Sequence, residues 1–191
     1  IEAGKMTLEL EEVDLGELVE ETLAQFRGQV LGSELSLEVD VPDDLRTVET
    51  DRGKLKQILI NLVGNAVKFT ERGRVVVRVL AEPATAKPRA IEVEDTGIGI
   101  PPDRLREIFE AFEQADTGTA RAYGGTGLGL TISSQLCRLL GYDLTVTSEV
   151  GEGSTFAVIL AEPPGGPDLA SSERGKRAVS GGASGDAPPA S

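Results

Sequence analysis

Hydrophobic residues recur at helical spacing in three parts of the chain. The pattern predicts three helices, which span 15–30, the residues from Thr50 or Asp51 to about Phe69, and 127–140. The apolar stripes of the first two helices consist of Leu15, Leu18, Val19, Thr22, Leu23 and Phe26, and of Leu55, Ile58, Leu59, Leu62, Val63, Ala66 and Val67. Asp14 is placed to cap the first helix, and Gly141 is placed to stop the third. Each helix therefore has one face suited to a core.

Apolar and polar residues alternate between these helices, which predicts the strands of a sheet. The strands are expected at 35–41, near 46–49, and at 74–80, 90–94, 143–148 and 155–160. Gly73 is expected to end the unit of the second helix, and the turn Val150–Gly153 to join the last two strands as a hairpin. The order of elements predicts an α+β fold, a two-layer α/β sandwich in which helices cover one face of a mixed, mostly antiparallel sheet.

Two stretches carry little of this patterning. Residues 98–126 are mostly polar and predict one short helix, from Asp103 as its N-cap to about Phe112. Long loops in compact domains are usually functional, so this segment is interpreted as a lid. From Pro163 the sequence is rich in Gly, Pro, Ala and Ser, which predicts a disordered tail or linker over 163–191. The domain itself is expected over 13–162, preceded by a linker over 1–12. Within that linker, weak alternation over 1–10 leaves an entry strand as the alternative.

The composition of the chain excludes several kinds of partner and of catalytic residue. The net charge of −13 argues against nucleic acid or anionic lipid as the main partner, and no apolar run approaches the ~20 residues of a membrane span. The single cysteine, Cys137, lies in an apolar helical pattern, is interpreted as buried, and fits a reducing compartment. The chain contains no histidine, which excludes a histidine general acid, a Ser-His-Asp triad and a histidine metal site.

The second predicted helix carries two amides and a cation on one face. Asn61, Asn65 and Lys68 are spaced i, i+4 and i+7, beside the apolar stripe. Amide oxygens suit Mg²⁺, and Lys68 can offset phosphate charge. The alternative is that Asn65 and Lys68 are ordinary exposed residues. Phe69 either lies against a base or belongs to the core.

A carboxylate and two glycines follow the strand at 90–94. Asp95 should be buried by its apolar neighbours and then needs a partner, which the amino group of adenine could supply. The alternative is a turn-initiating Asp, which is common before glycine. Gly97 and Gly99 allow a flat base to approach the backbone.

A second glycine run opens the third helix. Gly125, Gly127 and Gly129 expose backbone N–H groups at a helix N-terminus, which favours anions. The run lacks the Gly-Lys-Ser/Thr of a P-loop, and its G-x-G-x-G spacing without a preceding strand disfavours a dinucleotide fold. Together the three motifs predict a site for ATP with Mg²⁺.

In these motifs the chain resembles the catalytic ATP-binding domain of sensor histidine kinases, within the GHKL superfamily. The resemblance covers about 1–160 and includes the N, G1, F and G2 boxes of that family in their correct order. The boxes correspond to 61–70, 95–100, 108–112 and 123–130, and Gly151–Phe156 is similar to the final motif of the family. The lid end, Arg121–Gly125, is similar to that of hybrid kinases, and 1–12 resembles the linker that follows a dimerisation domain.

The resemblance implies roles for individual residues. Asn61, Asn65 and Lys68 would form the catalytic group, with the two amides on Mg²⁺ and Lys68 on phosphate. Asp95 would receive the adenine amino group, and Thr155 would assist through a water. The remaining contacts expected to hold the nucleotide are Phe69, Gly97, Gly99, Ile100, Phe109, Gly125, Thr126, Gly127, Leu128 and Gly129. Phe109 and Phe112 would also anchor the lid, and Arg121 is either a phosphate contact or a solvated lid residue.

The position of Asn61 separates the kinases from other members of the superfamily. Water-activating members carry Glu there, and an amide is no general base. The expected function is therefore a protein-histidine kinase domain that donates the γ-phosphoryl group of Mg-ATP. The acceptor would be a histidine on a separate dimerisation domain of the same parent protein. A response regulator or receiver domain would be a further partner, without nucleic acid or membrane contact. The location would be cytoplasmic, whether or not the parent is membrane-anchored. The alternatives are a GHKL-type ATPase and a non-catalytic nucleotide-binding or docking module.

Overall fold

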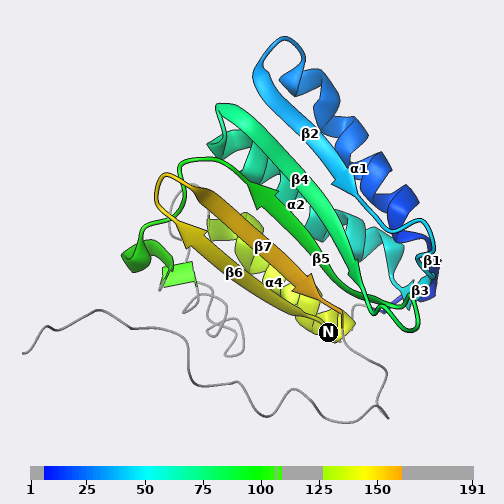
Figure 1. Ribbon diagram of the computed structural model, residues 1–191. Coiled ribbons are helices and arrows are strands. Elements are labelled where there is room, and N and C mark those ends of the chain that lie inside the picture. Colours follow the sequence, from blue (N-terminus) through cyan, green and yellow to red (C-terminus); the bar gives the residue numbers. More distant parts are fainter. Residues whose placement is uncertain (1–6, 106, 109–126, 161–191) are drawn as a thin grey trace, which may run out of the picture. The chain divides into compact units, whose positions relative to one another are not determined.

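A five-stranded sheet with helices on one face forms the domain (Figure 1). The computed structural model describes residues 7–105, 107–108 and 127–160. The order across the sheet is β2-β4-β5-β7-β6, with β2 parallel to β4 and the other pairs antiparallel. These strands are β2 (Glu34–Asp40), β4 (Arg72–Ala81), β5 (Pro88–Asp95), β6 (Asp143–Glu149) and β7 (Gly153–Ile159). The covering helices are α1 (Leu15–Val30), α2 (Arg52–Phe69) and α4 (Gly127–Leu140). The predicted α+β sandwich is confirmed.

Strand alternation divides the sheet into a core face and an open face. Val75, Val77 and Val79 of β4 are fully or almost fully buried beneath the helices. On the open face, Arg78 lies between strands and pairs with Asp40 of β2 and with Glu92 and Glu94 of β5. Such partly exposed ion pairs add at most ~1 kcal/mol each. The core face therefore supplies most of the stability.

The helix starts follow the predicted capping chemistry. The Asp14 carboxylate accepts the Glu17 N–H at 3.0 Å. Asp51, rather than Thr50, caps α2 and accepts the Lys54 N–H at 3.0 Å. All six predicted apolar positions of α1 are buried. Of the predicted apolar positions of α2, all are buried except Val67, which is partly exposed. These stripes face the core.

A small second sheet joins the beginning of the chain to the domain. Its strands β1 (Glu11–Val13) and β3 (Val48–Thr50) run antiparallel. The Asp51 carboxylate also accepts the Glu9 N–H at 3.0 Å. Part of the segment expected as a linker is thus hydrogen-bonded to the domain.

Two local predictions are wrong. Gly73 does not separate α2 from β4 but lies inside β4 at φ +111°, opposite Leu35 of β2. Asp103 does not cap its helix, because the helix already begins at Pro102 and the Leu105 N–H donates to the Pro101 carbonyl at 2.9 Å. Proline suits a first helical position, where its missing N–H is not needed.

The end of α4 is closed as predicted by Gly141, which adopts φ +77°. The N–H groups of Gly141 and Tyr142 donate to the carbonyls of Arg138 and Cys137, the pattern of a Schellman motif. Cys137 is buried as expected, and burial raises the pKa of its thiol to about 12. In the described ranges, no helix has the length and apolar character that crossing a bilayer requires.

Candidate functional site

Helix α2 carries the polar face predicted from the sequence. Asn61 and Asn65 are half-buried and Lys68 is exposed, beside the buried stripe that includes Leu62. The Lys68 ammonium lies 5.2 Å from the centre of the Phe69 ring. Two amides and one cation therefore form a polar face on α2 that is accessible to solvent.

The end of β5 packs against the end of α2. Asp95 is only 7% exposed, and its carboxylate accepts the Gly97 N–H at 2.8 Å and faces the Thr70 hydroxyl at 3.5 Å. The Ile98 N–H donates to the Phe69 carbonyl at 3.2 Å. The loop after β5 is thus fixed to the helix that carries Asn65 and Lys68, which brings the predicted base and phosphate groups into one region.

Burial raises the pKa of Asp95, while hydrogen bonds from the backbone of Gly97 and Ser154 and from Thr70 oppose the rise. A buried carboxylate whose oxygens can accept a further hydrogen bond is stabilised by a ligand that donates one. The amino group of adenine is such a donor. The arrangement supports the predicted role of Asp95.

Glycines make the loop after β5 possible. A Cβ at Gly97 would lie 2.3 Å from the Phe69 carbonyl oxygen, and one at Gly99 would lie 2.1 Å from that of Glu149. Gly99 also adopts φ +68°. The backbone approaches so closely at both positions that no side chain fits.

A serine network connects the same loop to the β6–β7 hairpin. The Ser148 hydroxyl accepts the Ile100 N–H at 2.8 Å, donates to the Gly153 carbonyl at 2.7 Å and lies 3.0 Å from the Ser154 hydroxyl. Sequence analysis missed Ser148, Ser154 and Thr70. Strand alternation was the available signal, because Ser154 pairs directly with Asp95 across the β5–β7 ladder.

Thr155 has a different partner across the β5–β7 ladder from that of Ser154. It pairs with Glu94, whose side chain lies on the open face of the sheet with Arg74 and Arg78. Successive side chains of a strand point to opposite faces, so Thr155 is directed away from the Asp95 side. Ser154 therefore lies on the same face of the sheet as Asp95, while Thr155 lies on the other face and lines the same hollow as Asp95. The predicted role of Thr155 through a water stays a prediction.

The start of α4 meets α2 through Asn61. The Asn61 amide nitrogen donates to the Gly129 carbonyl at 3.3 Å and to the Ser133 hydroxyl at 3.2 Å. This contact places the glycine-rich start of α4 beside the polar face of α2. Helix α4 begins at Gly127, as predicted.

Several predicted site residues lie outside the described residues. These are Phe109, Phe112, Arg121, Gly125 and Thr126. Gly127 and Leu128 are described only as the helical backbone that begins α4. Their roles stay predictions.

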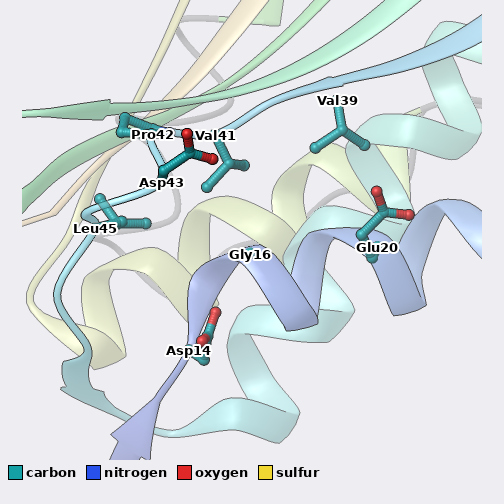
Figure 2. A pocket seen from close by; sticks show the side chains of 8 residues that line it. All are labelled: Asp14, Gly16, Glu20, Val39, Val41, Pro42, Asp43 and Leu45. Atoms are coloured by element: carbon teal, nitrogen blue, oxygen red, sulfur yellow. The ribbon is translucent and has the colours of Figure 1, made fainter.

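Two hollows mark the surface of the described part. One of about 390 Å³ lies at the ends of β5, β6 and β7. It is lined by residues from both faces of these strands: Glu94, Asp95, Thr96, Thr147, Ser148, Glu149, Glu152, Gly153, Ser154 and Thr155. The other, of about 370 Å³, lies between α1 and the end of β2 (Figure 2). Its charged lining residues are Asp14, Glu20 and Asp43, all acidic. The charged residues that line the first hollow, Glu94, Asp95, Glu149 and Glu152, are acidic as well, so neither hollow by itself suits a triphosphate.

The donor set limits how a metal could bind. Among the described residues, no group of three or more His, Cys, Asp or Glu side chains is placed to hold an ion. A metal held here would depend on amide oxygens, waters and ligand phosphates, which is the usual mode for Mg²⁺. The half-buried Asn65 fits that mode.

The sheet, the buried Asp95 and the polar face of α2 describe an ATP-binding domain of the histidine-kinase type. The chain belongs to the family described as "Histidine kinase-, DNA gyrase B-, and HSP90-like ATPase", which matches residues 50–164.

Individual relatives agree with this family. The chain is 43% identical over 166 residues to the circadian input-output histidine kinase CikA of Synechococcus elongatus, covering 85% of this chain and 22% of CikA. It is 37% identical over 164 residues to the hybrid signal transduction histidine kinase B of Dictyostelium discoideum, covering 84% of this chain and 8% of that protein. The structure is similar to full-length ShkA in complex with AMPPNP, with a TM-score of 0.67, 35% identity, and coverage of 85% and 34% of the two chains. The chain thus spans less than a quarter of the two relatives compared by sequence.

Proposed function

We propose that this domain binds Mg-ATP and donates the γ-phosphoryl group to a histidine on another domain. The observation that carries the proposal is the position of α2. One end of the helix is fixed to the Asp95 loop, and its middle is fixed to the start of α4. A nucleotide whose base meets Asp95 would then extend its phosphates along the face that bears Asn65 and Lys68.

The metal would be held by few protein atoms. The Asn65 amide oxygen is the first candidate ligand, and the oxygen of Asn61 is the second. Magnesium would neutralise phosphate charge, and Lys68 would add a positive charge at the same place. Phosphoryl transfer depends mainly on such positioning and charge stabilisation.

Transfer to a protein, rather than to water, is proposed because α2 carries an amide at position 61 and not a general base. The Asn61 amide cannot accept a proton from water. In the proposed step a histidine ring nitrogen attacks the γ-phosphorus, and the bond from that phosphorus to the bridging oxygen breaks. ADP then leaves with the electron pair. The chain contains no histidine, so the acceptor must lie outside it.

The proposed partners follow from the relatives. A dimerisation domain of the parent protein would carry the histidine, and a receiver domain or response regulator would take the phosphoryl group next. The name of the Dictyostelium relative is that of a hybrid kinase, which supports a receiver domain in the same parent. A cytoplasmic location, where ATP is available, stays a prediction.

Calorimetry with Mg-ATP tests the binding step. The unmodified chain should bind, and Asp95→Asn should weaken binding by roughly ten- to a hundredfold, because an amide N–H₂ would face the adenine amino group. Asn65→Asp should change the Mg²⁺ concentration required for ATP binding more than it changes the affinity for adenosine. Equal affinity of Asp95→Asn and the unmodified chain would refute the base assignment.

Labelled ATP tests the transfer step. The chain alone should acquire no label from γ-labelled ATP, and the label should appear on an added dimerisation domain that carries the histidine. Steady phosphate release by the chain alone, abolished in Asp95→Asn, would instead identify a water-activating ATPase.

A further inference from the structure

The polar contact between α2 and α4 gives Asn61 a task apart from metal binding. Its amide nitrogen reaches two acceptors on α4, the Gly129 carbonyl at 3.3 Å and the Ser133 hydroxyl at 3.2 Å. These are 68 and 72 residues away in the chain. The two N–H bonds of one amide thus connect two helices that pack against each other.

The chemistry of the acceptors fixes the orientation of the amide. A backbone carbonyl can only accept hydrogen bonds, so the group that faces Gly129 must be the N–H₂ of Asn61. Ser133 is fully buried, with 0% exposure, and a buried hydroxyl requires a partner. A carboxylate at position 61 could not donate to the Gly129 carbonyl and would repel it.

The contact lies at a sensitive part of α4. Gly129 is the third residue of the helix, and Gly127–Gly129 is the part proposed to face phosphate. The first N–H groups of a helix have no partner within the helix, so they bind an anion only if the first turn is held in place. A shift of the first turn would move those donors away from the phosphates.

We infer that Asn61 is a positioning residue. Through Gly129 and Ser133 it holds the start of α4 against α2, so that the first backbone N–H groups of α4 meet the phosphates of ATP. The inference rests on the proposed function. It also gives a reason for an amide, rather than the Glu of the water-activating members, at this position.

Paired substitutions in the full chain test the inference. Ser133→Ala removes an acceptor of Asn61, and the buried Ser133 cannot itself touch nucleotide. We expect it to weaken Mg-ATP binding about three- to tenfold, the effect of one hydrogen bond, and to change adenosine binding less than twofold. Ser134→Ala is the matched control, because it removes the hydroxyl of the next buried serine on the same helix.

A double-mutant cycle then measures the coupling. Asn61→Ala should weaken Mg-ATP binding at least as much as Ser133→Ala does. Adding Ser133→Ala to Asn61→Ala should have little further effect, because the contact is already lost. Equal effects of Ser133→Ala in the two backgrounds would overturn the inference.

Amide hydrogen exchange separates this inference from the proposed function. In the nucleotide-free chain, Asn61→Ala and Ser133→Ala should both speed exchange at 130–134 severalfold and leave β4 and β5 unchanged. Unchanged exchange at 130–134, or faster exchange throughout the domain, would refute the positioning role. If the unmodified chain bound no Mg-ATP, the proposed function would fail, and the exchange result would still decide whether Asn61 holds α4.

Discussion

The glycines at the two ends of the candidate site differ in what surrounds them. At the base end, a Cβ on Gly97 or Gly153 would collide with backbone oxygens, at 2.3 Å from Phe69 and 1.9 Å from Asp95. At the phosphate end, a Cβ on Gly129 would meet no atom within 4 Å. The fold itself therefore requires the glycines near Asp95. At Gly129 the described residues leave room for a side chain, and the proposed approach of ATP phosphate to α4 would account for a glycine there.

The same contrast applies to hydrogen bonds. Asp95, Ile100 and Ile98 are connected to α2 and to the β6–β7 hairpin by several bonds. At the start of α4, the Asn61 side chain makes two hydrogen bonds that connect the helix to α2. In the proposed function, the base end would therefore be held by the core of the fold, and the phosphate end would depend on the contact that Asn61 makes with α4.

Gly153→Ala should have the largest effect on stability. The new Cβ would lie 1.9 Å from the Asp95 carbonyl oxygen, at a backbone φ of +116° that suits glycine. We expect a loss of about 3 kcal/mol or more in the free energy of unfolding, measured by urea denaturation and circular dichroism.

Gly151→Ala is the matched control for that measurement. Gly151 lies in the same turn at φ +86°, but its Cβ would meet no atom within 4 Å. It should lose only the conformational part, about 1–2 kcal/mol. Equal losses of stability in the two variants would show that the close approach of the Asp95 backbone does not exclude a side chain at position 153.

Gly129→Ala should have the opposite profile. Alanine in a helix is better than glycine by up to ~1 kcal/mol, so stability should be unchanged or slightly higher. Mg-ATP binding should fall at least about tenfold, because the methyl group would occupy space left for phosphate. Gly28→Ala in α1, which is equally unobstructed, should leave ATP binding unchanged. Full ATP affinity in Gly129→Ala would remove the distinction between the two ends.

The two buried carboxylates Asp51 and Asp95 should respond to acid in opposite ways. Burial raises the pKa of Asp51, but hydrogen bonds from the Lys54 side chain, the Lys54 backbone and the Glu9 backbone outweigh burial. Together they lower the pKa from 3.8 to about 2. Asp51 therefore stabilises the fold by up to about 2 kcal/mol above pH 4, and this contribution disappears as the pH falls toward 2. The pKa of Asp95 is raised, so its charged form costs stability at neutral pH and the cost disappears in acid.

Urea unfolding at several pH values checks these signs. At pH 7, Asp51→Asn should be less stable than the unmodified chain, and Asp95→Asn should be equally or more stable. The difference for Asp51→Asn should shrink as the pH falls below 4, whereas the difference for Asp95→Asn should shrink already as the pH falls towards 4 and be lost below it. A less stable Asp95→Asn at pH 7 would mean that its carboxylate serves the fold rather than a ligand.

Periodicity predicted most of the fold because burial decides it. The stripes of α1 and α2, the cap at Asp14 and the stop at Gly141 are local patterns with a direct physical cause. Pairing between distant segments, as in β1 with β3, leaves no such local pattern. Gly73 was misplaced for a related reason, since its φ of +111° is set inside β4.

The sequence predicted those parts of the candidate site in which the side chain itself indicates the chemistry. Asp95 is buried and Asn65 and Lys68 lie together, as the motifs indicated. Contacts that depend on strand register were missed. Thr155 was expected beside Asp95, but Ser154 lies there. The two positions differ by one residue, and a step of one residue along a strand moves the side chain to the other face of the sheet.

Substitutions at Ser154 and Thr155 should give the smallest effects and show which of them belongs to the base end. Ser154→Ala removes the hydroxyl that lies 3.0 Å from that of Ser148, in the network that holds the Ile100 N–H. We expect a loss of about 1 kcal/mol in stability and a loss of a few-fold in ATP affinity. Thr155→Ala, opposite Glu94 on the open face, should change ATP affinity less than twofold. If calorimetry instead found the larger loss in Thr155→Ala, the base end would extend to the open face of the sheet, and the register argument for Ser154 would fail.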